Sequence, residues 1–91
     1  MTCYAIIFTD DIEIFNLTKI ERKASINILS DLSTGYIFSG IFQFIIRNKN
    51  SDIYVIESDG DINDLYDYYL DDPTDFTNTV KSVGKCLYQP N

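Results

Sequence analysis

The chain has 91 residues, of which 45% are apolar and 14% aromatic, and it carries a formal net charge of −7. This length and composition predict a single folded domain over residues 1–91. The absence of histidine excludes a Ser-His-Asp triad, a Cys-His pair and histidine metal ligands within the chain. We therefore expect no enzymatic activity, no metal site and no cofactor.

Two paired strands are predicted at the start of the chain. Cys3–Thr9 is a nearly continuous apolar run, which is typical of a strand buried on both faces. Ile12–Asn16 alternates and predicts a second strand, joined to the first by a tight turn at Asp10 and Asp11. That turn has no Gly or Asn to supply a positive φ.

A helix is expected next, over residues 19–33. Thr18 and Glu21 match the capping-box pattern, and apolar residues at spacings of four follow as far as Leu32. A strand is the competing interpretation, because Ser25–Ile28 also alternates.

A long strand is predicted over Tyr36–Arg47, and a turn at 48–51 joins it to another strand over Ile53–Ile56. Both sides of Tyr36–Ile46 are apolar near the middle. Either helices cover both sides of this strand, or one side contacts another protein.

Two helices are predicted in the last third of the chain. Asp61 can cap the first, and Asp72 can cap the second, with Pro73 in its first turn. The predicted apolar stripe of the first helix is Ile62, Leu65, Tyr66, Tyr69 and Leu70. The residues predicted to share one face of the last helix are Phe76, Val80, Val83 and Leu87. Together these elements predict an α+β fold with an antiparallel sheet of about four strands, packed by two to three helices in the order ββαββαα.

The acidic residues gather in one segment, Asp52–Asp75, which holds nine acids and no base. At about 100° per residue, Asp64, Asp67 and Asp71 fall opposite the apolar stripe of the first of these helices, in a single acidic row. Tyr68 lies beside that row. Carboxylates at successive helical turns are about 5–6 Å apart, so the row resembles the phosphates of a nucleic-acid strand.

These features favour a non-catalytic acidic binding protein, an inhibitor or modulator that acts as a nucleic-acid mimic on a basic protein surface, such as that of a nucleic-acid enzyme. An exposed tyrosine suits the role of anchor, because Tyr is enriched at interface hot spots. The residues predicted to bind the partner are Asp61, Asp64, Asp67, Tyr68, Asp71, Asp72 and Asp75. The competing interpretation is a solvated polar face that only keeps the protein soluble.

Three other functions stay open. A structural or self-assembling subunit could use the apolar side of Tyr36–Ile46. A symmetric dimer could join Lys19, Arg22 and Lys23 of one copy to the acidic row of another. A small carboxylate-based enzyme needs two acids beside a deep cleft, which 91 residues hardly provide. Direct nucleic-acid binding is disfavoured by the net charge.

Further features bear on location and chemistry. Cys3 and Cys86 are expected to be two buried free thiols, with a bridge between them as the alternative. Glu57–Asp61 resembles a calcium loop, but positions 1 and 12 of that loop would fall on Val55 and Tyr66, which lack carboxylates.

We expect no membrane span and a cytoplasmic protein. The abundant Ile, Asp, Asn, Ser and Tyr are typical of an AT-rich genome such as that of a phage, whose host cytoplasm would then be the location.

Overall fold

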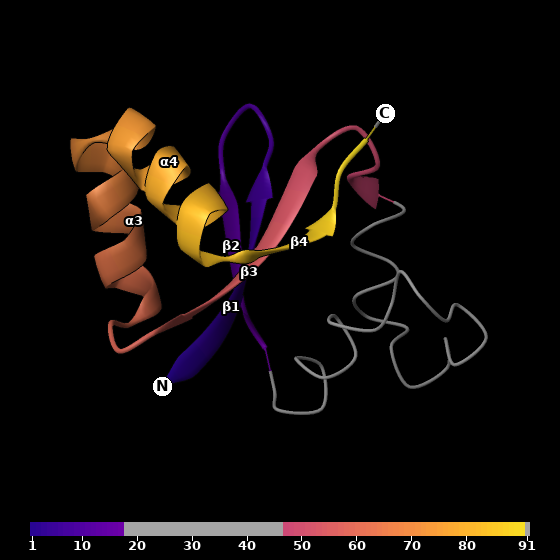
Figure 1. Cartoon of the computed structure of the whole chain (residues 1–91). Coiled ribbons are helices and arrows are strands. Elements are labelled where there is room, and N and C mark those ends of the chain that lie inside the picture. The colour runs from indigo at the N-terminus through magenta and orange to yellow at the C-terminus, as the bar shows by residue number, and fades with distance from the viewer. Residues whose placement is uncertain (18–46, 91) are drawn as a thin grey trace.

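The computed structural model describes residues 1–17 and 47–90 (Figure 1). Its elements in chain order are β1 (Thr2–Phe8), β2 (Glu13–Leu17), β3 (Asp52–Ser58), α3 (Ile62–Asp71), α4 (Pro73–Val83) and β4 (Lys85–Tyr88). This is the predicted α+β class, with an antiparallel sheet and helices packed on it. Two predicted elements lie outside the described residues. They are the helix over 19–33 and the strand Tyr36–Arg47, of which only the last residue is described.

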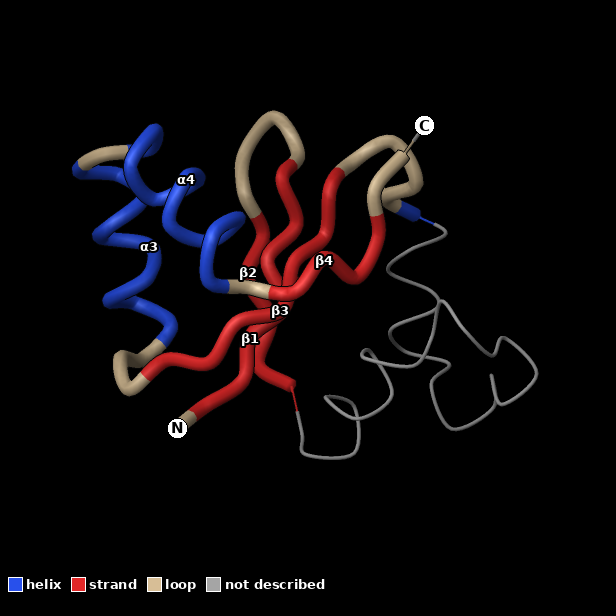
Figure 2. The backbone as a smooth tube through the Cα atoms, in the orientation of Figure 1, coloured by secondary structure: helices blue, strands red, loops and turns tan. Residues whose placement is uncertain are grey.

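The sheet has four strands in the order β2-β1-β3-β4, and every neighbouring pair is antiparallel. Figure 2 shows these strands in red beside the two blue helices. The predicted pairing of the first two strands is confirmed, with Ala5 opposite Phe15. The predicted order ββαββαα is not matched, because the chain returns to the sheet as β4 after its two helices. Sequence periodicity did not reveal β4, since a strand of four residues is too short to show a clear alternation.

The end of the last helix is where the prediction was wrong. We expected Val83 and Leu87 to lie on one buried face of α4. Instead α4 ends at Val83, which is 72% exposed, and Gly84 caps it. Leu87 is buried, but it belongs to β4. A buried apolar residue at helical spacing can therefore reach the core from a following strand.

The two helices lie together on one side of the sheet (Figure 1). Side chains of β1 that face them, Tyr4 and Ile6, join a buried cluster with Leu65 of α3 and Phe76 of α4. The opposite side of the sheet carries a second buried cluster, which includes Ile7. Cys3 through Ile7 are all buried, so the prediction that the first strand is buried on both faces is confirmed.

The turn between β1 and β2 forms without a residue at positive φ, since none occurs among the described residues. The hydroxyl of Thr9 donates a hydrogen bond to the backbone carbonyl of Asp11. A short polar side chain thus satisfies a backbone group where Gly or Asn would otherwise be used. The turn leaves both Asp10 and Asp11 exposed.

Two tyrosine hydroxyls tie the sheet to the segments around α3. Tyr4 of β1 donates to the carbonyl of Gly60 at 2.8 Å, in the turn before α3. The amide of Ile14 donates to the hydroxyl of Tyr66 at 3.1 Å. Because β2 lies at the edge of the sheet formed by the described strands, this contact satisfies a backbone donor that their pairing leaves open. These contacts hold α3 in a fixed orientation on the sheet.

Cys3 and Cys86 do not form a disulfide. Cys3 is buried as expected, whereas Cys86 is exposed, which corrects the prediction that both are buried. Cys86 is an exposed residue of β4 and lies opposite Tyr54 of β3.

Candidate functional site

The acidic row lies on the side of α3 that faces away from the sheet. Leu65 is the buried residue of this helix, and it fixes the direction of the core. Asp64, Asp67 and Asp71 are all exposed, as the helical geometry predicted. Within the described parts of the chain, the side chains of Asp67 and Asp71 form no hydrogen bond or ion pair. These two carboxylates are therefore available to a partner.

The first two carboxylates of the predicted binding set cap α3. The backbone amide of Asp64 donates to Asp61 at 2.9 Å, and the amide of Asp61 donates to Asp64 at 3.0 Å. This reciprocal capping box satisfies two amides at the start of the helix. The negative charges also lie at the positive end of the helix dipole. Asp61 and Asp64 thus stabilise the helix, although they still contribute to the negative potential around it.

The remaining predicted residues join α3 to α4. Asp72 caps α4 by accepting the amide of Asp75 at 3.1 Å. Tyr68 donates its hydroxyl to the carboxylate of Asp75, and the same hydroxyl lies 3.1 Å from the hydroxyl oxygen of Thr79. Its ring meets Phe76 edge-on, with centroids 5.3 Å apart. Tyr68 therefore occupies the interface between the helices and is not a free anchor beside the acidic row.

The contact with Asp75 also changes the acidity of Tyr68. The hydrogen bond to that carboxylate raises the pKa of the phenol above its ordinary value, because the bond requires the proton. Tyr68 therefore remains a neutral hydrogen-bond donor at physiological pH. Its role is to hold the two helices together.

Leu70 is the residue that sequence reasoning assigned to the wrong side. It was predicted to belong to the apolar stripe, but the structure leaves it 73% exposed. On a helical projection it lies next to Asp67 and on the outer half of α3. A partner that covered this side chain would remove its apolar surface from water, which favours binding. Helical projection alone could not reveal this, because Leu65 and Leu70 lie at the two opposite edges of the predicted stripe and only Leu65 is buried.

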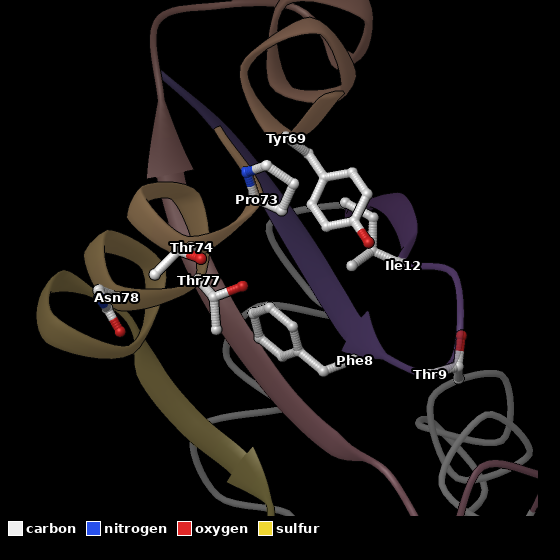
Figure 3. Close-up of a pocket in the computed structure, with 8 residues that line it drawn as sticks. All are labelled: Phe8, Thr9, Ile12, Tyr69, Pro73, Thr74, Thr77 and Asn78. Carbon is white, nitrogen blue, oxygen red and sulfur yellow. The ribbon is translucent and has the colours of Figure 1, made fainter. Parts of the chain in front are cut away.

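An open pocket of about 330 Å³ lies where the turn between β1 and β2 meets the junction of α3 and α4. Figure 3 shows the rings of Tyr69 and Phe8 beside the same space, with α4 along one side. The apolar lining residues are Phe8, Ile12, Tyr69 and Pro73, and the polar ones are Thr9, Thr74, Thr77 and Asn78. None of these side chains carries a charge. Sequence reasoning missed this pocket because residues near position 10 and near position 73 form it together.

Comparisons with protein-family models, with curated proteins and with solved structures gave no match to this chain. In the described parts of the chain, no group of three or more acidic or cysteine side chains is placed to hold a metal ion. None of the helices described is long and apolar enough to span a bilayer. Two surfaces considered in the sequence analysis lie outside the described residues. They are the apolar side of Tyr36–Ile46 and the basic patch of Lys19, Arg22 and Lys23.

Proposed function

We propose that the chain is a non-catalytic acidic binding protein, an inhibitor or modulator that docks the outer face of α3 on a basic protein surface. The observation that carries the proposal is the group formed by Asp67, Leu70 and Asp71 on one helix. Two carboxylates without a described partner lie on one side of an exposed leucine, and no basic residue occurs between positions 52 and 75. We name these three residues the outer face of α3.

The energetics favour a mixed interface over a purely ionic one. An exposed ion pair contributes only about 0.2–1 kcal/mol, so two carboxylates act mainly on association rate and orientation. Complete burial of a leucine side chain contributes about 1.5–3 kcal/mol. Leu70 is therefore the expected anchor, and the surrounding charges select a basic partner.

The resemblance of carboxylates at successive helical turns to a row of phosphates suggests a basic surface that ordinarily binds nucleic acid. A protein bound there would act as a nucleic-acid mimic and block that surface. The proposed compartment is the cytoplasm, which would be that of the host if a phage encodes the chain. The contacts that fix α3 on the sheet support this role, because a rigid surface loses little conformational freedom when it binds.

The first test compares two variants that lose the same amount of charge. Asp67→Asn combined with Asp71→Asn changes the outer face of α3. Glu13→Gln combined with Glu57→Gln is the control, because strand alternation places both residues on the side of the sheet away from the helices. Each double variant has a net charge of −5. Partners captured from the native cell by tagged wild-type protein should be retained by the control and lost by the first variant.

The second measurement uses the captured partner after purification. Its affinity for the wild-type chain should fall steeply as salt increases from 0.05 to 0.5 M (roughly a threefold change in Debye length). Leu70→Ala should weaken binding about tenfold or more at every salt concentration. Equal retention by the two double variants, or an affinity that salt does not change, would contradict the proposal.

A further inference from the structure

The pocket between the turn and the helix junction is a second site, separate from the outer face of α3. We propose that it binds a small organic cation with an apolar body, such as an aryl-alkyl ammonium ion. This inference goes beyond the proposed function and does not depend on it. It rests on the uncharged lining of the pocket and on the exposed acidic residues that are next to its lining residues in the chain.

The interior of the pocket suits an apolar body. The rings of Phe8, Tyr69 and Pro73 offer flat apolar surfaces (Figure 3), and planar or aliphatic groups pack well against such rings. The volume of about 330 Å³ is at the small end of the range for ligand pockets. A charged group placed inside would lose its hydration without gaining an ionic partner. The ligand's charge must therefore remain at the opening.

The surroundings of the opening select a positive charge. Asp10 and Asp11 connect the lining residues Thr9 and Ile12, and both are exposed. On the opposite side, the exposed Asp72 directly precedes the lining residue Pro73. An ammonium group at the opening can approach these carboxylates while the apolar body stays inside.

Lys81 is a cation near the pocket in the part of the chain that the structure describes, and its charge is already compensated. The ammonium of Lys81 lies 5.1 Å from the centroid of the Phe8 ring and 5.9 Å from that of Tyr54. It is 3.0 Å from the carboxylate of Asp52, with which it forms an ion pair. Lys81 therefore adds little net positive charge at the opening, and it shows that the Phe8 ring accepts a cation over its face.

The test uses three probes that share one phenyl body: 2-phenylethylammonium, 2-phenylethanol and 3-phenylpropionate. Each is titrated into the full chain at low ionic strength and followed by NMR shifts of Phe8, Tyr69 and Thr77. We expect the cation to bind about 3- to 10-fold more tightly than the anion, with the alcohol between them. The cation should also raise the melting temperature, because it binds only the folded chain.

Two variants separate the role of charge from that of shape. Asp10→Asn combined with Asp11→Asn should reduce the preference for the cation to less than about twofold, whereas Glu13→Gln combined with Glu57→Gln should preserve it. Thr77→Phe should fill the pocket and abolish binding of all three probes. Ser82→Phe adds an aromatic ring on the same helix outside the pocket and should leave binding unchanged.

Either of two results would overturn the inference. One is equal affinity for the three probes in the wild-type chain, and the other is no saturable binding at millimolar concentration. If Thr77→Phe prevents folding, the Asp10 and Asp11 variant still decides the question, because both side chains are exposed. Neither result depends on the partner of the outer face of α3, so this site and the proposed function can fail separately.

Discussion

At the scale of single residues, most of the predicted binding carboxylates first stabilise their own helices. The pairs Asp61–Asp64 and Asp72–Asp75 have the same spacing of three, and both form caps at a helix start. The roles of Asp61 and Asp72 as caps were predicted and are confirmed. The contact of Tyr68 with Asp75 was not predictable, because it depends on how α4 packs beside α3. Local spacing therefore predicts caps, whereas contacts between helices need the fold.

Gly84 is the residue whose size is most tightly constrained. A Cβ at this position would lie 2.7 Å from the carbonyl oxygen of Val80, 2.8 Å from a methyl carbon of Ile56 and 3.0 Å from the carbonyl oxygen of Val55. Two of these neighbours are backbone atoms and cannot rotate away. We expect Gly84→Ala to lower the free energy of unfolding by about 1–3 kcal/mol, measured by urea denaturation.

The matched control is Ser82→Ala, an exposed position two residues earlier in α4. It should change the free energy of unfolding by less than about 0.5 kcal/mol. If the two substitutions have the same small effect, the close approach of α4 and β3 at Gly84 does not constrain packing.

At the scale of elements, apolar periodicity located α3 but overestimated the width of its buried face. Counted from Leu65 at about 100° per residue, Tyr68 is about 60° away and Leu70 about 140° away. Because α4 packs on the side of Tyr68, that tyrosine completes the buried face and Leu70 is left outside. Periodicity gives the direction of a stripe, but the neighbouring elements decide where the stripe ends.

Two leucines of α3 provide a direct test of this assignment. Leu65 is 8% exposed and Leu70 is 73% exposed. Leu65→Ala should lower the free energy of unfolding by about 2–5 kcal/mol, because it leaves a cavity in the core. Leu70→Ala should change it by less than about 0.5 kcal/mol. Thermal or urea melts that show equal losses would mean that the helix is rotated from the orientation described.

At the scale of the whole molecule, the positions of strands and helices along the chain were more predictable than the topology that joins them. The strand pair at the start, the strand at Ile53–Ile56 and both final helices were predicted and are confirmed. The return of the chain as β4 was missed, because its pairing with β3 leaves no local pattern. The acidic row was predicted from helical geometry. The pocket was not, since its two sides are about sixty residues apart in the chain.

The position of β1 inside the sheet has a consequence for folding kinetics. This strand lies between β2, which follows directly, and β3, with which it pairs Thr2 opposite Ser58. The first pairing closes a short loop, but even the nearest pair of the second, Phe8 and Asp52, is more than forty residues apart in the chain, so its closure costs more entropy. We expect α3 and α4 to form early and the β1–β3 pairing to limit refolding to milliseconds or longer. Stopped-flow refolding should show this as slow protection of the β3 amides. Equally fast protection of helix and strand amides would instead indicate that the sheet forms together with the helices.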